Sequence, residues 1–157
     1  QAQLNTGMFV SWVEQLLLKY PELRPILVLS GDPSALSGFD VKGLQSPARY
    51  AMNLLKKPEM KSQLFSVSCH QVAELQQAAR LGADFVTLSP VQRTPSHPSA
   101  KEMGWARFSE LVSQCKFPVY ALGGMRSEDG LTCIKHGGQG VAGISMWRDN
   151  DARIDNV

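Results

Sequence analysis

The sequence predicts one α/β domain built on a parallel sheet, and three observations lead to this prediction. Short apolar runs alternate with amphipathic stretches along all 157 residues, a pattern typical of parallel strands joined by right-handed helical crossovers. The expected strands do not alternate cleanly between polar and apolar side chains, as is typical of strands covered on both faces. No long repeat or low-complexity linker divides the chain. A doubly wound sheet and a (β/α) barrel both fit this pattern.

The first half of the chain predicts its elements less sharply than the second half. In the first helix, Phe9, Val13 and Leu16 recur at helical spacing. Before the second helix, a Ser-Pro pair supplies an N-cap residue and a proline at the first helical position. The expected elements are a strand stub at 2–4, a helix at 9–20, strands at 26–29 and 39–45, and a helix from Ser46–Pro47 to about residue 57.

The second half carries clearer element boundaries. Gly82 suits the C-terminal cap of one helix, and Gly137–Gly138 suit the end of another. A loop rich in Pro, Ser and Thr separates the two middle helices. The expected elements are strands at 64–69, 85–88, 119–122 and 141–146, helices at 71–81, 105–115 and from Ser127 to about 136, and the loop at 89–103.

Composition and charge give no support for several classes of partner. Hydrophobic residues make up 43% and charged residues 19% of the chain, which is an ordinary balance for a globular protein. A net charge of +2 gives no electrostatic argument for nucleic acid or an anionic membrane as partner. The three cysteines are odd in number and lack metal-ligand spacing, which predicts thiols in a reducing compartment. We therefore expect a cytoplasmic protein without nucleic-acid or membrane partners.

Two glycine-containing strand ends predict a phosphate site. Gly123 and Gly124 directly follow one expected strand and precede the helix from Ser127, so free amide groups can face an anion there. Gly143, Ile144 and Ser145 end the last strand and could offer two further amides and a hydroxyl. The alternative is that Gly123 and Gly124 only make a tight turn. Two such strand ends in succession favour phosphate.

Polar side chains at other strand ends are candidates for ligand contact. Arg126 follows the glycine pair, and the guanidinium fork suits phosphate, although surface loops often carry arginine for no such reason. Ser68 and His70 close the 64–69 strand. His70 is a candidate catalytic residue, as general acid or as hydrogen-bond donor to a ligand. Equally, it could cap the next helix or pack beneath it.

The long loop holds the second candidate catalytic histidine, His97, beside the hydroxyls of Thr94 and Ser96. Short hydroxyls next to an imidazole could surround a polyanion, and a loop of this length is often functional. No pair of carboxylates stands at the strand ends of the second half. We therefore predict no dedicated metal site.

Several ordered motifs resemble the thiamine phosphate synthase family, which includes the related thiazole tautomerases. The resemblance implies a TIM-type (β/α)8 barrel in which the backbone near Gly124, with Ile144 and Ser145, holds the phosphate of the product. The matching stretches are Ser66–His70, Gly82–Val91, Thr94–Pro98, Pro118–Met125 and Gly138–Ser145.

The Thr-x-Ser-His-Pro motif followed by Gly104–Trp105 is similar to the synthase-like domain that follows a Nudix hydrolase domain in MutT-type proteins named for 8-oxo-dGTP cleavage. This implies that residues 1–157 are one barrel domain of a longer protein with a Nudix domain upstream. Residues 2–4 would match the second strand of the family. The barrel would then lack its first βα unit here.

The resemblance also implies a loss of synthase activity. A synthase of the family holds a diphosphate through Mg²⁺ and cationic side chains. Here Asn5, Ser34, Ser46 and His97 stand where the family uses charged groups. We expect a degenerate barrel that binds a phosphorylated small molecule, with weak or no synthase activity of its own. The alternatives are an active synthase, which would need Mg²⁺, or another thiazole-processing reaction that uses His70 or His97.

Overall fold

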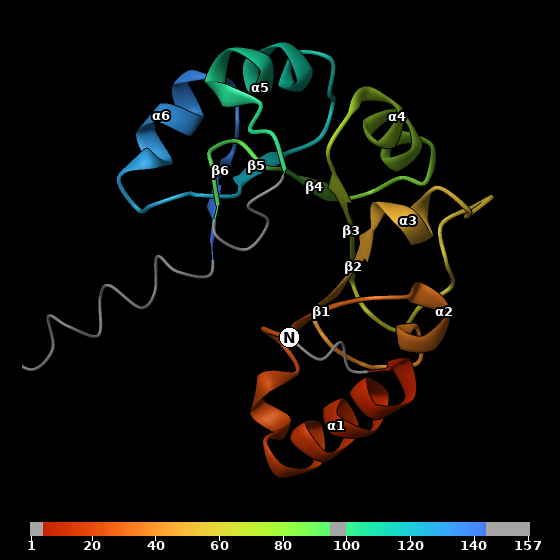
Figure 1. Cartoon of the computed structure of the whole chain (residues 1–157). Coiled ribbons are helices and arrows are strands. Elements are labelled where there is room, and N and C mark those ends of the chain that lie inside the picture. The colour runs from red at the N-terminus through yellow and green to blue at the C-terminus, as the bar shows by residue number, and fades with distance from the viewer. Residues whose placement is uncertain (1–4, 95–99, 144–157) are drawn as a thin grey trace, which may run out of the picture.

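The computed structural model describes residues 5–94 and 100–143 of the chain (Figure 1). Its strands form one six-stranded sheet of parallel neighbours, and their order in space is their order in sequence. The strands are β1 (Val28–Ser30), β2 (Gly43–Pro47), β3 (Leu64–Cys69), β4 (Phe85–Leu88), β5 (Val119–Leu122) and β6 (Gly140–Ala142). The helices are α1 (Thr6–Lys19), α2 (Pro33–Leu36), α3 (Ala48–Ala51), α4 (Val72–Arg80), α5 (Gly104–Val112) and α6 (Asp129–Lys135), with a 3-10 turn η1 at Pro21–Leu23.

Strand order separates the two architectures that the sequence pattern leaves open. A doubly wound sheet needs a point where the strand order reverses, and the observed order has none. Figure 1 shows the strands following an arc with the helices along its outer side. The fold is therefore a curled half-barrel, which confirms the barrel-type α/β prediction and excludes the doubly wound sheet. The predicted lack of a first βα unit stays a prediction.

The hydrophobic core lies between the strands and the outer helices. Phe65, Val67 and Val86 are fully buried on the strands, and Phe108 on α5 is fully buried against the same cluster. Complete burial of a side chain of this size stabilises the fold by about 1.5–3 kcal/mol. The core therefore fixes the ends of the strands, from which the candidate site is built.

The opposite, concave face of the sheet carries polar side chains. The Gln45 amide on β2 donates to the Thr87 hydroxyl on β4 at 2.9 Å. The intervening strand β3 places Ser66 opposite Gln45 and Ser68 opposite Thr87. Because both β3 residues are small, the Gln45 side chain can reach across β3. Ser68, a candidate ligand contact, is half-buried on this face.

The second half of the prediction is confirmed closely. Strands β3, β4 and β5 have the predicted bounds. Helix α4 lies within one residue of its prediction, and Gly82 follows it with a φ of 64°, as expected for a C-terminal cap. Asp84 precedes β4 and accepts from the Phe65 amide at 2.7 Å, so its role is structural, as its position at the amino end of the strand predicts.

The first half requires several corrections. Ser46 and Pro47 belong to β2 and do not start a helix, and α3 ends at Ala51 instead of near residue 57. The Gln77 side chain of α4 explains the early end, because its amide donates to the carbonyls of Ala51 and Leu54 at 3.0 and 2.7 Å. A side chain thus satisfies carbonyl groups that a longer helix would have used.

A further correction is the short helix α2, which the sequence did not predict. Asp32 caps it by accepting from the Ser34 amide at 2.9 Å, and Pro33 takes its first position. Helix α1 begins earlier than predicted because Asn5 acts as its N-cap and accepts from the Met8 amide at 2.8 Å. Among the described residues, no helix is long and apolar enough to cross a membrane.

Candidate functional site

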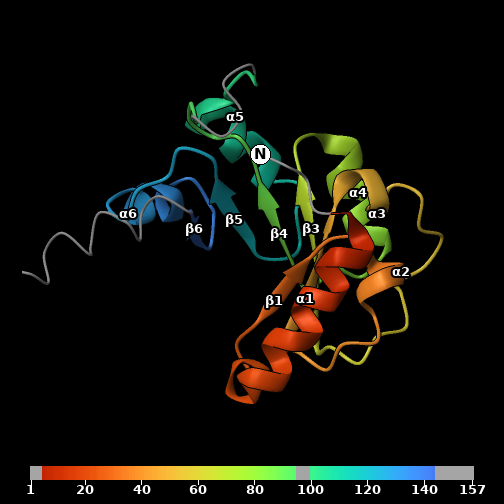
Figure 2. The same cartoon turned by 60° about the horizontal axis from the view of Figure 1, so that its bottom comes forward.

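The sequence predicts site residues at the carboxyl ends of the strands, and Figure 2 shows the strands running in one direction toward that edge. Gly123 and Gly124 directly follow β5 with φ values of 90° and 69°. His70 directly follows β3, and Ser89 directly follows β4. Parallel strands thus bring residues that are distant in sequence to one edge of the sheet.

The glycine pair packs against the loop after β4. A Cβ atom on Gly123 would lie 2.8 Å from Pro90 Cα, and one on Gly124 would lie 2.5 Å from the carbonyl oxygen of Arg93. The Gly123 carbonyl accepts from the Gln92 amide at 3.0 Å. The positive φ values and the close approach of the loop after β4 therefore explain why both positions carry glycine.

The amide groups of this turn carry the argument for an anion. Within residues 5–94 and 100–143, no hydrogen bond is found for the N–H groups of Gly123, Gly124 and Met125. A backbone N–H without an acceptor favours an oxyanion that can supply one. The turn thus explains the glycines, and within the described residues these three amides have no acceptor.

Asp129, which the sequence analysis did not single out, ties the two loops of this site together. Its carboxylate accepts from the Arg126 amide at 2.9 Å and from the Gln92 side chain at 3.2 Å. The Arg126 side chain is exposed and lies 3.7 Å from the Glu128 carboxylate. A surface pair of this length is weak, so the guanidinium can exchange partners readily.

His70 is fixed at the neighbouring strand ends. Its Nδ1 donates to the Ser89 carbonyl at 2.8 Å, because a carbonyl oxygen can only accept. In the neutral ring, Nε2 is then left as an acceptor for a ligand. His70 does not cap α4, because the N-cap residue is Gln71, which has no side-chain cap, and the His70 amide instead donates to the Glu74 carboxylate at 2.5 Å. The His70 side chain is exposed, so packing under the helix is wrong as well as capping, and the ligand role stays a prediction.

The neighbouring Cys69 is not a nucleophile at neutral pH. Its side chain is fully buried, and burial raises the pKa of the thiol to about 12.

The remaining predicted ligand contacts lie in the loop after β4 and at the end of the last strand. Thr94 lies half-buried after β4, whereas Ser96, His97, Ile144 and Ser145 lie outside the described residues.

A pocket of about 190 Å³ at the carboxyl ends of β1 and β2 holds two charged residues that the sequence analysis did not assign, Asp32 and Arg49. The sequence signal that could have identified Asp32 as an N-cap is the Asp-Pro pair, because proline favours the first position of a helix. Ser34 and Ser46, which the resemblance predicts at the metal positions of the family, lie in different environments. The Ser34 hydroxyl donates to Asp32 at 2.8 Å, and Ser46 is fully buried.

This pocket is poorly suited to the Mg²⁺ that a synthase would use. Mg²⁺ sites need oxygen ligands, with one or two carboxylates beside the phosphates of the substrate. Asp32 supplies one carboxylate, whose Oδ1 already accepts from the amide and hydroxyl of Ser34. The Arg49 guanidinium lines the same pocket and repels a divalent cation. Within the described residues, a single carboxylate beside a guanidinium therefore makes this pocket a poor site for the metal.

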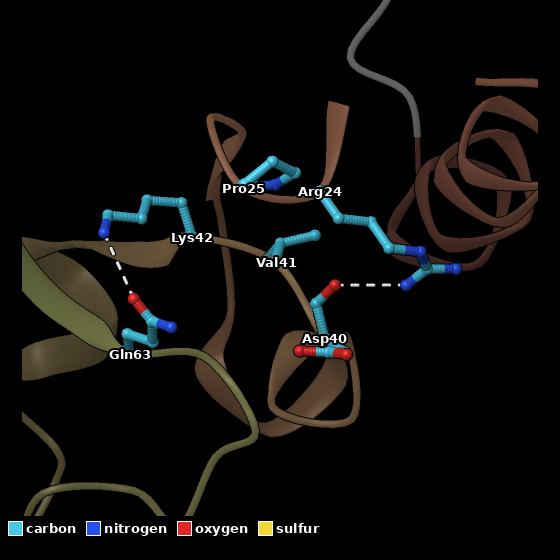
Figure 3. Close-up of a pocket in the computed structure, with 6 residues that line it drawn as sticks. All are labelled: Arg24, Pro25, Asp40, Val41, Lys42 and Gln63. Atoms are coloured by element: carbon cyan, nitrogen blue, oxygen red, sulfur yellow. Dashed lines mark hydrogen bonds between the residues drawn. The ribbon is translucent and has the colours of Figure 1, made fainter. Parts of the chain in front are cut away.

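A larger pocket of about 340 Å³ lies at the opposite end of the sheet (Figure 3). Figure 3 shows its two cationic side chains pointing away from each other. Arg24 donates to the Asp40 carbonyl at 3.1 Å, and Lys42 donates to the Gln63 side chain at 3.1 Å. Because the two cations do not converge, this pocket does not form a site for one small anion.

Known proteins similar to this chain agree with the predicted family. A family model described as thiamine monophosphate synthase matches residues 27–147. A protein of Aquifex aeolicus named "Putative thiamine-phosphate synthase 2" is 44% identical over 80 residues, which cover 51% of this chain and 43% of that protein. A protein of Geobacter sulfurreducens named "Putative thiamine-phosphate synthase" is 35% identical over 109 residues, which cover 68% of this chain and 49% of that protein. The chain thus spans less than half the length of these two relatives.

Solved structures show the same fold. The thiamine phosphate pyrophosphorylase of Pyrococcus furiosus superposes with a TM-score of 0.66 at 20% identity, covering 92% of this chain and 70% of that one. The thiamine phosphate pyrophosphorylase of Bacteroides thetaiotaomicron superposes with a TM-score of 0.53 at 24% identity, covering 88% and 66% of the two chains. At these identities the likeness concerns the fold alone.

Proposed function

Since the chain belongs to the thiamine monophosphate synthase family, we propose that it binds the phosphate of a small phosphorylated ligand at the carboxyl end of β5. The observation that carries this proposal is the row of amides at Gly123, Gly124 and Met125, for which no acceptor is found among the described residues. Amides held by a rigid turn can bind an oxyanion without reorganising. Ile144 and Ser145 are proposed to complete this phosphate site from the end of the last strand.

The neighbouring groups suit a ligand with a polar organic part. Arg126 is exposed beside the amides and can add a charged hydrogen bond to the phosphate. His70 lies at the end of β3, and no hydrogen bond of its Nε2 is found among the described residues. Ser68 lies on the concave face of the same strand. We propose these residues, with Thr94, Ser96 and His97 of the long loop, as contacts to the rest of the ligand.

We propose that the domain is a weak or inactive synthase. Substitution at a diphosphate requires the charge of the leaving group to be neutralised as it departs. The pocket near β1 and β2 supplies one carboxylate beside a guanidinium, which does not suit Mg²⁺. As the notable motifs around Thr94 and Gly104–Trp105 resemble Nudix-linked domains, we further propose that this barrel domain accompanies a Nudix hydrolase domain in a cytoplasmic protein.

The second candidate function is an active thiamine phosphate synthase. The 44% and 35% identities to proteins named as synthases favour it. A coupled assay with the pyrimidine diphosphate, the thiazole phosphate and Mg²⁺ distinguishes the two candidates. We expect no turnover above the background rate of the substrates. A turnover close to that of a synthase of the family, measured in parallel, would establish the second candidate.

Ligand binding is tested separately by heat denaturation. A ligand that binds the native state raises its stability by about 2.7 kcal/mol at a concentration of 100 Kd. We expect thiamine phosphate to raise the Tm and unphosphorylated thiamine to leave it unchanged, because the phosphate makes the amide contacts. Equal shifts with the two compounds, or no shift with either, would contradict phosphate recognition.

A further inference from the structure

Gln92, in the loop after β4, holds the glycine turn after β5 at two points. Its backbone N–H donates to the Gly123 carbonyl at 3.0 Å, and its side-chain amide donates to the Asp129 carboxylate at 3.2 Å. The three amides of the proposed phosphate site, at Gly123, Gly124 and Met125, belong to the segment that these two bonds delimit. One residue of the neighbouring loop therefore spans the turn that presents the amides.

Asp129 uses both oxygens of its carboxylate in this arrangement. Oδ1 accepts from the Gln92 side chain, and Oδ2 accepts from the Arg126 amide at 2.9 Å. Since the Arg126 N–H has this acceptor, the row of amides for which none is found among the described residues ends at Met125. Gln92 and Asp129 are both half-buried, which strengthens a hydrogen bond between them.

The loop after β4 and the glycine turn are also in close contact through their backbones. A Cβ atom on Gly124 would lie 2.9 Å from Gln92 Cβ and 2.5 Å from the Arg93 carbonyl oxygen. A shift of the loop is therefore transmitted to the turn. Because coupling between two sites is reciprocal, a phosphate on the amides and the position of this loop influence each other.

We propose that Gln92 and Asp129 are a positioning pair, which sets the phosphate affinity of the turn without contacting the ligand. The proposal deepens the proposed function and rests on it for the ligand. A turn that is already fixed has less to order when the phosphate binds, so the pair acts by preorganisation. A carboxylate opposes an anion by its charge, so a gain in affinity from Asp129 can come only from geometry.

NMR titration of the full chain with thiamine phosphate, and separately with inorganic phosphate, tests this proposal. We expect Asp129→Ala to weaken the binding of both probes about tenfold, because the turn loses both hydrogen bonds to this carboxylate. Charge alone predicts the opposite result, since the variant removes a negative charge near the anion. Glu14→Ala removes an exposed carboxylate on α1 and is the charge-matched control, which should leave both affinities unchanged.

Exchange of the two side chains separates positioning from general damage to the fold. Gln92→Glu sets two carboxylates against each other and should weaken both probes about tenfold. Asp129→Asn alone should not weaken them, because its oxygen can accept from the Arg126 amide while the Gln92 amide turns over to accept from its NH₂ group. The double variant, Gln92→Glu with Asp129→Asn, restores one carboxylate and one amide at the parent's net charge. It should bring both affinities back to within about threefold of the parent's.

The two probes and the parent chain keep the possible outcomes distinct. Weakening that is confined to thiamine phosphate would mean that the pair contacts the organic part of the ligand, and would overturn the positioning role. A double variant that binds no better than Gln92→Glu would overturn it as well. A parent chain that binds while all variants bind equally would overturn the pair alone. A parent chain whose amides at Gly123, Gly124 and Met125 respond to neither probe would overturn the proposed function, and the role of the pair with it.

Discussion

Gly82 and Gly124 show how one residue type answers two different physical demands. They have nearly the same backbone conformation, with φ values of 64° and 69°. Around Gly82 a Cβ atom would meet nothing within 4 Å, whereas on Gly124 it would lie 2.5 Å from the Arg93 carbonyl oxygen. Gly82 needs glycine for backbone conformation alone, and Gly124 needs it also for space.

Alanine substitutions at these two glycines separate the two demands. We expect Gly82→Ala to lower the free energy of unfolding by about 1–2 kcal/mol, the cost of the left-handed conformation. Gly124→Ala should cost more, because the loop after β4 must also move. Urea denaturation of the two variants measures the difference. Equal losses would mean that the Arg93 backbone does not press on this position.

Cys69 predicts a pH dependence of stability. Because its pKa rises from 9.0 to about 12 on folding, the native state holds a proton that the unfolded state releases. The contribution is fully present below pH 9 and is lost as pH rises toward 12. Between these limits the free energy of unfolding should fall by about 1.4 kcal/mol per pH unit from this group.

The pH dependence of the free energy of unfolding is compared with that of Cys69→Ala, because the other groups that titrate at alkaline pH are the same in the parent chain and the variant. We expect urea denaturation between pH 9 and 11 to show a steeper loss of stability for the parent chain than for Cys69→Ala. Parallel curves would show that the thiol ionises in the folded state as easily as in the unfolded one.

Among the elements, those with strong local signals were predictable and the short ones were not. Strands β3, β4 and β5 are apolar runs bounded by turn residues, and their bounds follow from sequence. Helices α2 and α3 have four residues each, which is too short for helical periodicity to show. The end of α3 depends on Gln77, which is distant in sequence, so no local pattern could predict it.

Substitution of Gln77 tests whether its side chain causes the early end of α3. We expect Gln77→Met to lower the free energy of unfolding by about 1–3 kcal/mol, because the Leu54 carbonyl loses its side-chain donor and the Ala51 carbonyl keeps only the Leu54 amide. Gln76→Met on the exposed side of α4 is the matched control and should change it by less than about 0.5 kcal/mol. Similar losses in both variants would remove Gln77 as the cause of the early helix end.

At the scale of the whole molecule, the parallel topology and one half of the site were predictable from sequence. Gly123 and Gly124 stand out because a glycine pair directly follows an apolar strand. Asp32 did not stand out because it follows β1, whose end was predicted at the wrong residue. Arg49 did not stand out because it belongs to α3, a helix too short to recognise from sequence. Their proximity in one pocket arises only when the parallel sheet brings the ends of β1 and β2 together.

The proposed binding of a phosphorylated ligand is tested most directly by amide chemical shifts of the full chain during titration with thiamine phosphate. The account predicts saturable shifts at Gly123, Gly124 and Met125, with thiamine itself producing none there. It also predicts that inorganic phosphate shifts the same amides more weakly, since it lacks the organic contacts. Thiamine phosphate that leaves these three amides unmoved while shifting others would contradict the account.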